Sequence, residues 1–217
     1  VEAGEQTGIL RSVKAVHISE LRLARPITEI ESDSVAHWPS GIAEFDRVLG
    51  GGIVPGATIL LSGEPGVGKS TLLLEVASRA AAGGMRVLYV TAEESASQVR
   101  LRAQRTGALQ PTLFLAAEID LATILGQIDQ VDPQLVIVDS VQTGSSSLTD
   151  GLAGGPAQVR EVASTLIRVS KDRNLPVLLV GHVTKDGTIA GPRLLEHLVD
   201  VVLQFEGDRQ TALRFVR

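Results

Sequence analysis

The stretch at residues 63–71, GEPGVGKST, limits what this chain can fold into more than any other part of the sequence. It has the spacing G-x-x-x-x-G-K-[ST], in which glycines let backbone N–H groups turn inward toward phosphate oxygens. The apolar run ILLS precedes it and STLLLEVASRA follows it, so a strand leads into the loop and a helix leads out. This context predicts a phosphate-binding loop for a nucleotide. The alternative is a chance match in a glycine-rich turn.

The residue types in the loop have chemical roles that fit a bound nucleotide. The Lys69 ammonium supplies a charge for the β- and γ-phosphates, and the Ser70 hydroxyl is suited to ligate Mg²⁺. A helix that begins near Lys69 directs its positive end at the same anion. We expect the Lys69 side chain to lie outside the hydrophobic core. The predicted nucleotide-binding set is the whole loop: Gly63, Glu64, Pro65, Gly66, Val67, Gly68, Lys69, Ser70 and Thr71.

Short β-prone runs alternate with segments of helical periodicity after residue 57. This alternation is typical of βαβ units and predicts an α/β fold, with a mostly parallel twisted sheet and helices on both faces. Strands are predicted at 58–62, 86–90, 113–117, 135–138, 177–180, 199–205 and 212–216. Helices are predicted at 69–82, 95–106, 121–130 and 156–173, after a short helix near 42–46 that Ser40 caps.

The chain is predicted to consist of a leader or linker, residues 1–38, and one nucleotide-binding domain, residues 39–217. The leader has weak periodicity and is expected to add one strand at 13–18. In the domain, the segment 143–155 reads TGSSSLTDGLAGG, which is too rich in glycine and serine to be ordered by its own packing.

Two of the predicted strands end in carboxylates. The strand in LVIVDS places Asp139 at the carboxyl edge of the sheet beside the phosphate loop, where Mg²⁺ or its water takes a second ligand. The alternative is that Asp139 caps the next turn. The strand in LYVTAEES ends in Glu93 and Glu94, and Glu93 is the candidate base that polarises a water. Both could instead be first-turn acids favoured by a helix dipole, which suits Glu94 well.

A third strand, in LLVGHVTKDG, ends in His182. A polar group that faces the γ-phosphate from a strand end can sense hydrolysis and pass it to the loop that follows. A structural role for this histidine is the alternative.

The composition excludes several classes of function. A net charge of −5 gives no overall attraction to nucleic acid or anionic membrane, so such binding needs a local patch. The absence of cysteine excludes disulfides and thiolate metal sites, and an aromatic fraction of 3% argues against aromatic platforms for bases. No apolar run is longer than residues 113–117, against roughly 20 residues for a membrane span. We therefore expect a soluble cytoplasmic protein that does not engage membranes.

These elements, in this order, resemble the RecA-type ATPase core. The segment 45–75, FDRVLGGGIVPGATILLSGEPGVGKSTLLLE, is similar to the start of the ATPase domain in the bacterial RadA (Sms) family and, less closely, in the KaiC clock proteins. The segments 186–208, DGTIAGPRLLEHLVDVVLQFEGD, and 159–164, VREVAS, resemble the RadA family specifically. The likeness covers roughly residues 40–217.

The resemblance implies a DNA-repair ATPase. Members of the family form hexameric rings, translocate on single-stranded DNA and promote branch migration of branched recombination intermediates beside the RecA recombinase. By position, residues 63–71 would be the Walker A loop for ATP or ADP, Asp139 the Walker B acid that helps hold Mg²⁺, Glu93 the catalytic glutamate and His182 a γ-phosphate sensor. The resemblance also implies a bacterial protein of the cytoplasm, associated with the nucleoid.

DNA contacts follow from the resemblance, not from charge. Residues 143–155 and 184–192 fall at two central loops that face DNA in the family; the first holds Asp150 and no Lys or Arg, and the second holds Lys185. We predict DNA binding by Lys185 and by Arg193 just beyond it. Unaided, this is not a nucleic-acid footprint. The alternative function is a KaiC-like, nucleotide-gated protein-interaction ATPase that does not act on DNA.

The sequence departs from the family pattern in three ways. RadA proteins carry an amino-terminal zinc finger with four cysteines, a Lys-Asn-Arg-Phe-Gly motif after the core and a Lon-protease-like domain, and none of these occurs in residues 1–217. We therefore expect an excised ATPase core, with zinc bound only by the family's missing finger.

Overall fold

The computed structural model describes residues 23–29, 37–183, 193–208, 211 and 213–217. The chain divides into two compact units, residues 1–34 and 35–217, and each is described on its own. In the first unit the described residues are exposed and contain one 3₁₀ turn, η2 (Ile27–Glu29). The strand predicted at 13–18 lies outside the described residues, and the boundary predicted after residue 38 stays a prediction.

The second unit is built on a seven-stranded sheet with the order β3-β2-β4-β5-β1-β6-β7. Its strands are β1 (Thr58–Gly63), β2 (Val87–Thr91), β3 (Leu113–Ala117), β4 (Leu135–Asp139), β5 (Val177–His182), β6 (Val201–Gly207) and β7 (Arg214–Val216). Neighbouring strands pair in parallel, except that β7 runs antiparallel to β6. The predicted α/β fold with a mostly parallel sheet is confirmed.

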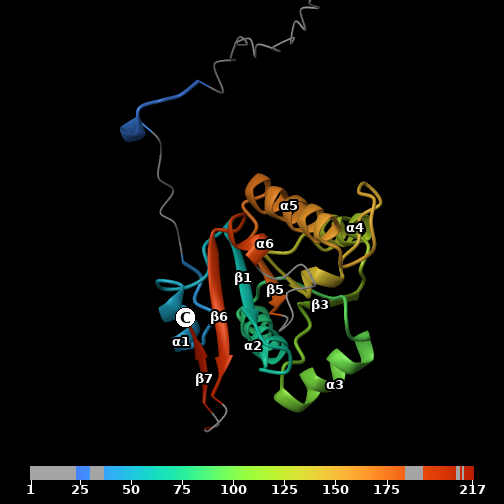
Figure 1. Ribbon diagram of the computed structural model, residues 1–217. Coiled ribbons are helices and arrows are strands. Elements are labelled where there is room, and N and C mark those ends of the chain that lie inside the picture. Colours follow the sequence, from blue (N-terminus) through green and yellow to red (C-terminus); the bar gives the residue numbers. More distant parts are fainter. Residues whose placement is uncertain (1–22, 30–36, 184–192, 209–210, 212) are drawn as a thin grey trace, which may run out of the picture. The chain divides into compact units, whose positions relative to one another are not determined.

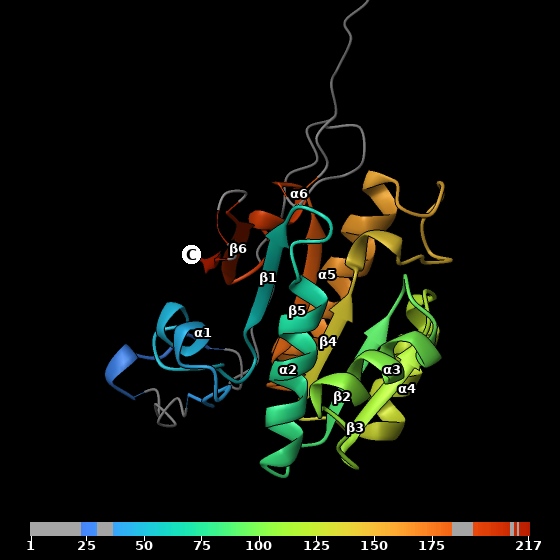
Figure 2. The same cartoon turned by 90° about the horizontal axis from the view of Figure 1, so that it is seen from below.

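Helices cover both faces of this sheet (Figures 1 and 2). They are α1 (Ala43–Val48), α2 (Lys69–Ala82), α3 (Ala96–Thr106), α4 (Leu121–Val131), α5 (Pro156–Asp172) and α6 (Arg193–Glu196), with a 3₁₀ turn η3 (Val141–Thr143) after β4. Residues of α1, α2 and α3 share one core cluster with Ile59 and Leu61 of β1, and residues of α4, α5 and α6 share the other with Leu60. Because both faces are buried, the central strands read as continuous apolar runs.

Most predicted element ends differ from the structure by one or two residues, and the predicted cap of the first helix also differs. Strand β6, for example, is predicted at 199–205 and observed at Val201–Gly207. The prediction that Ser40 caps the first helix is wrong, because α1 begins at Ala43 and its N-cap is Ile42, without a side-chain cap. The Ser40 hydroxyl accepts a hydrogen bond from the Ile42 N–H at 3.1 Å, and the Ser40 N–H donates to the Asp46 carboxylate at 2.7 Å. Ser40 therefore fixes the turn before the helix. Strand β5 also continues two residues past the predicted end, to His182.

The strand register places the polar strand ends side by side. Gly63 at the end of β1 lies opposite His182 at the end of β5, and Thr91 at the end of β2 lies opposite Asp139 at the end of β4. Carboxyl ends of parallel strands share one edge of the sheet, which is where ligands bind in open α/β folds. The sheet thus gathers residues that are far apart in the sequence at the start of the phosphate loop.

Strand β6 closes this edge by a very close approach to Gly63. A β-carbon added to Gly63 would lie 2.3 Å from the backbone oxygen of Phe205. Real β-carbons do not come so close to a carbonyl oxygen, so only glycine fits while β6 pairs with β1 as it does. The residue that begins the phosphate loop is therefore fixed by sheet packing as well as by the loop's own shape.

We expect Gly63→Ala to lower the free energy of unfolding by about 3 kcal/mol, because the clash is with backbone and no rotamer change can relieve it. The matched control is Gly126→Ala in α4, where an added β-carbon meets nothing within 4 Å. There the variant is expected to gain up to about 1 kcal/mol from helix propensity. Urea unfolding of both variants measures the difference, and equal stabilities would show that the Gly63 contact does not constrain the fold.

Candidate nucleotide-binding site

The phosphate loop joins β1 to α2 as the sequence predicts. Helix α2 begins at Lys69, and its N-cap residue Gly68 has φ +110°, a left-handed conformation that other residues rarely adopt. Glu64, Pro65 and Gly66 lie exposed at the surface. The first backbone N–H groups of α2 have no partner within the helix, so the exposed loop and the helix start together can receive an anion.

Lys69 lies beneath this loop. Lys69 is 3% exposed but belongs to neither hydrophobic core cluster, so it lies outside the core as predicted and is nevertheless buried. The ammonium donates to the backbone oxygens of Gly63 at 2.8 Å and of Glu64 at 2.9 Å, which is what allows a cation to be buried here. Burial lowers the pKa of Lys69, and the charges of Asp139 and Glu93 oppose that shift. The Lys69 ammonium and the carboxylates of Asp139 and Glu93 thus lie close enough beneath the loop for their charges to interact.

The structure separates the two adjacent glutamates that the sequence left as alternatives. Glu93 receives the Ser140 hydroxyl on Oε1 at 2.5 Å, and Nε2 of His182 lies 3.0 Å from the same oxygen. Glu94 instead pairs with Arg102 of α3 at 2.6 Å. Glu93 therefore faces the strand ends of β4 and β5, whereas Glu94 is engaged by the helix that follows β2.

The contacts on Glu93 keep its carboxyl group ionised. The His182 imidazole has the largest effect, and with the Ser140 hydroxyl it lowers the pKa of Glu93 to about 2, although burial acts in the opposite direction. Both contacts involve Oε1, so Oε2 remains available to accept a hydrogen bond from a water. A carboxylate with so low a pKa is suited to orienting and polarising a water more than to holding its proton.

Gln142, in η3, links the end of β5 to the start of the segment 143–155. Its side-chain amide donates to the backbone oxygen of His182 at 2.8 Å and accepts from the His182 N–H at 2.7 Å. The Nδ1 atom of His182 is buried and has no hydrogen-bond partner among the described residues. The histidine is thus fixed through its backbone, while its ring keeps an unused nitrogen at the sheet edge.

Asp139 and Ser70 are the residues suited to Mg²⁺. The Asp139 carboxylate is 5% exposed, and its Oδ2 accepts a hydrogen bond from the buried Tyr89 hydroxyl at 2.7 Å. Ser70 is half-buried in the first turn of α2. A hydroxyl and a carboxylate are hard oxygen donors of the kind that Mg²⁺ takes when a nucleotide supplies further oxygens. Within the described part of the chain no group of three or more His, Cys, Asp or Glu side chains could hold a metal by itself.

Two hollows flank the phosphate loop, and both are lined by Pro65. The one of about 460 Å³ includes Glu93, Gln142 and His182. The other, of about 620 Å³, runs along the loop to β6 and β7 and includes Phe205 and Arg214. An elongated ligand with its phosphates at the loop therefore has space on either side. The smaller hollow carries Glu93 and His182, and the larger one carries other carboxylates, those of Glu64, Glu196, Glu206 and Asp208.

Of the two residues predicted to contact DNA, only Arg193 is among the described residues. Lys185 and the segment 184–192 lie outside the described residues. Arg193 is the first residue of α6, is exposed, and lines the same hollow as the phosphate loop. In the segment 143–155, Leu148 and Leu152 are 82% and 87% exposed.

The segment 143–155 is held by a side chain from a helix. Gln158 of α5 is buried, and its amide accepts from the Ser146 N–H at 2.7 Å and donates to the Ser146 oxygen at 3.1 Å and to the Thr149 oxygen. This agrees with the prediction that the segment is not ordered by its own packing, since the ordering contacts come from outside it.

Four residues of the site were missed from the sequence: Tyr89, Ser140, Gln142 and Arg214. Arg214 of β7 donates from Nε to the Val67 oxygen at 2.9 Å and so supports the phosphate loop from the far end of the chain. The positions of Ser140 and Gln142, directly after Asp139 in the sequence, are a signal that could have been used. Tyr89 and Arg214 carry no such signal, because their contacts depend on strand pairing.

Comparison with known proteins agrees with this geometry. The family model described as "AAA domain" matches residues 24–188. The DNA repair protein RadA of Mycolicibacterium smegmatis is 59% identical over 198 residues, which is 89% of this chain and 42% of that protein. The DNA repair protein RadA of Listeria monocytogenes is 46% identical over 93% of this chain and 44% of its own length, and that of Bacillus subtilis is 45% identical over 88% and 42%.

The chain thus spans less than half the length of the curated relatives it matches. No helix among the residues described here has both the length and the apolar character needed to span a membrane. Three findings agree on the family of this chain. The family model matches most of the chain, the sheet has a RecA-like strand order, and the identity to these relatives is high. The chain belongs to the AAA domain family and, within it, to the RadA-type, RecA-like P-loop ATPases.

Proposed function

We propose that the chain binds ATP with Mg²⁺ and hydrolyses it, as the motor part of a protein that acts in DNA repair. The observation that carries this proposal is the meeting of Lys69, Asp139 and Glu93 at one edge of the sheet, beside a loop that can receive phosphates. The names of the RadA relatives support the DNA-repair role.

In this proposal the nucleotide lies across the phosphate loop. Its β- and γ-phosphates contact the loop's N–H groups and the Lys69 ammonium, which turns from the loop's own carbonyl oxygens to the phosphates. The γ-phosphate points to the hollow that contains Glu93 and His182, and the nucleoside extends into the hollow along β6 and β7. This orientation is supported by the contacts that Ser140 and His182 make with Glu93, because a hydrolytic water needs a positioned carboxylate beside it.

Hydrolysis then needs a water in line with the γ-phosphate. Glu93 orients this water through Oε2 while Ser140 and His182 hold Oε1. Mg²⁺, held by Ser70 and Asp139, neutralises the charge of the β- and γ-phosphates when it is bound. Lys69 stabilises the charge that develops on the same oxygens.

His182 is suited to sense the γ-phosphate. Its ring contacts Glu93 and has a second nitrogen without a hydrogen-bond partner among the described residues. If the ring moves toward the γ-phosphate, the Gln142 amide transmits the movement to the segment 143–155, because it is bonded to both backbone groups of His182. A purely structural histidine would not need an unused nitrogen at this edge.

We further propose that the protein binds single-stranded DNA through the segments 143–155 and 184–192, with Lys185 as a phosphate contact and Arg193 as a second one. Six copies in a ring would line a channel with these segments, and with the RecA recombinase beside them they would promote branch migration. The names of the RadA relatives support the role in DNA repair, and the remaining details follow from the family resemblance. We also propose a location in the bacterial cytoplasm near the nucleoid.

The second candidate, a KaiC-like ATPase that acts on protein partners without DNA, is favoured by the acidic composition and by the absence of Lys and Arg from the segment 143–155. The ATPase rate distinguishes the two, measured for this chain and for the chain extended to the length of its RadA relatives. Stimulation by single-stranded DNA supports the DNA motor. An unchanged rate in the extended protein would favour the protein-interaction ATPase.

Glu93→Gln is expected to bind ATP normally and to hydrolyse it about 10²- to 10⁴-fold more slowly, because an amide cannot polarise the water. Glu94→Gln is the matched control, since it makes the same change one residue away and only weakens the pair with Arg102. Steady-state ATPase and equilibrium nucleotide binding are measured for both. A large loss of turnover in Glu94→Gln together with normal turnover in Glu93→Gln would move the role by one residue.

Lys185→Ala in the extended protein is expected to weaken binding to every single-stranded DNA sequence alike and to reduce the salt slope by about 0.7, because one phosphate contact is lost. Arg193→Ala tests the second predicted contact. If Arg193 contacts DNA, its variant has the same effect; if it faces the nucleotide from its hollow, the KM for ATP rises without DNA present. Unchanged DNA affinity for both variants across a salt titration would place the DNA site elsewhere.

A further inference from the structure

The buried hydroxyl of Tyr89 is hydrogen-bonded to the carboxylate proposed to help hold Mg²⁺. The Tyr89 hydroxyl lies 2.7 Å from Oδ2 of Asp139. Tyr89 is fully buried and Asp139 is 5% exposed, so water does not compete for this hydrogen bond. An ionised carboxylate only accepts hydrogen bonds, so the tyrosine is the donor.

The strand pairing explains why these two side chains meet. Tyr89 of β2 lies opposite Ile137 of β4 in the parallel register. Side chains alternate between the faces of a strand, so Asp139, two residues after Ile137, projects from the same face as Ile137. Tyr89 and Ile137 belong to the core cluster on the α2 and α3 side of the sheet. The Tyr89 side chain therefore reaches diagonally across this face, from β2 to the end of the neighbouring strand β4.

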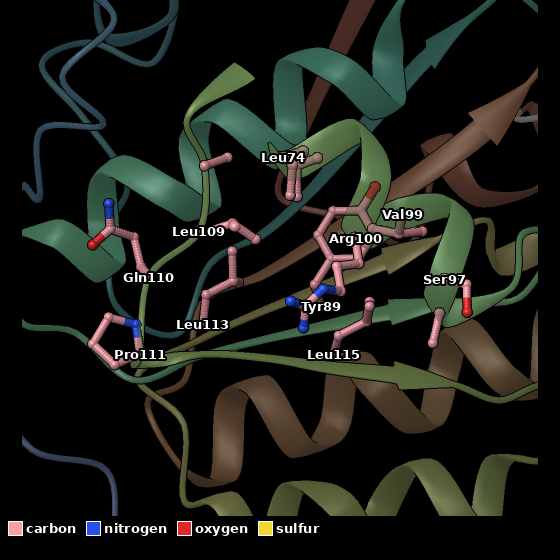
Figure 3. A pocket seen from close by; sticks show the side chains of 13 residues that line it. Leu74, Tyr89, Ser97, Val99, Arg100, Leu109, Gln110, Pro111, Leu113 and Leu115 are labelled. Atoms are coloured by element: carbon pink, nitrogen blue, oxygen red, sulfur yellow. The ribbon is translucent and has the colours of Figure 1, made fainter. Parts of the chain in front are cut away.

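The rest of the Tyr89 side chain is held by apolar contacts. It lines a hollow of about 540 Å³ between α3, β3 and α2, together with Leu74, Val99 and Leu115 (Figure 3). The same hollow also has polar side chains in its lining, those of Ser97, Arg100 and Gln110, while Tyr89 itself belongs to the buried core cluster with Leu74 and Val99. The ring position is thus set by packing, and its hydroxyl is directed at Asp139. A side chain that is fixed in this way can orient a carboxylate without any contact to the nucleotide.

We infer that Tyr89 is a positioning residue for the Mg²⁺–nucleotide complex: its hydroxyl occupies Oδ2 of Asp139 and leaves Oδ1 directed at the metal or at its water. The inference rests on the proposed function of this site. Partners behind a metal ligand fix its orientation, and their removal typically lowers metal affinity about 10- to 100-fold. The polar contact of the Tyr89 hydroxyl is with Asp139, so its effect should depend on the metal.

The test is the variant Tyr89→Phe, which removes one oxygen and keeps the ring. ADP binding is measured by calorimetry in EDTA and again over a titration of Mg²⁺. We expect the affinity for ADP without metal to stay within about twofold of wild type, and the half-saturating Mg²⁺ concentration to rise about tenfold. An unchanged Mg²⁺ dependence would overturn the inference. An equal loss of affinity with and without Mg²⁺ would also overturn it, because it would indicate a merely structural role.

Two further variants make the result specific. Thr58→Val is the matched control, since it also removes a buried hydroxyl from a central strand, and this hydroxyl has no partner among the described residues. It is expected to leave the Mg²⁺ dependence unchanged. In an Asp139→Ala background the effect of Tyr89→Phe should disappear, because the side chain that accepts the Tyr89 hydrogen bond is then absent. Additive effects would contradict the proposed route through Asp139.

A second readout does not require the variant to fold well. Tyr89 is the single tyrosine of the chain, so its ring carbon bonded to oxygen gives one assignable NMR signal in the wild-type protein. Adding Mg²⁺ to the ADP complex should shift this signal, and no shift would overturn the inference. If the wild type does not bind ADP under any condition, the proposed function fails, and the inference fails with it.

Discussion

Parallel pairing of β2, β4, β5 and β1 is the constraint on which the rest of this molecule depends. It brings Thr91, Asp139, His182 and Gly63 to one edge of the sheet, although these residues come from distant parts of the sequence. Every polar contact of the site is made at or beside this edge. The close approach of β6 to Gly63 then fixes where the phosphate loop starts relative to those strand ends.

The site also places one cation beside two carboxylates. Lys69 is buried with its ammonium on two carbonyl oxygens, and the charges of Asp139 and Glu93 act to keep it protonated. Lys69 contributes in turn to the low pKa of Glu93, although the His182 imidazole contributes most. A polyphosphate that binds at the loop adds negative charge to the site. Lys69 and His182 are the groups that would contact this negative charge. The Lys69 ammonium donates to neutral carbonyl oxygens, and the His182 ring contacts a carboxylate that the Ser140 hydroxyl also contacts.

The sequence was sufficient for the sheet, the phosphate loop and the acidic strand ends, because each of these has a local signal. Apolar runs of five or six residues mark strands that are buried on both faces, and glycine at fixed spacing marks the loop. The contacts that complete the site have no local signal. Tyr89 looks like any core aromatic until β2 is paired with β4, and Arg214 reaches Val67 from 147 residues away. The choice between Glu93 and Glu94 likewise needed the position of Arg102, since both follow the same strand. The burial of Lys69 also has no local signal, because it depends on the loop's own carbonyl oxygens, which accept hydrogen bonds from the ammonium.

Calorimetric titration with ADP and Mg²⁺ of the wild type and of Lys69→Met tests the central claim most directly. Methionine keeps the length and the packing of the buried stem and removes only the ammonium group. The account predicts that the wild type binds ADP–Mg²⁺, and that the variant keeps its free energy of unfolding but loses about 10- to 100-fold in affinity, as expected for a lost charge-assisted hydrogen bond. Equal affinity of the two proteins would contradict the claim that this edge of the sheet is the nucleotide site.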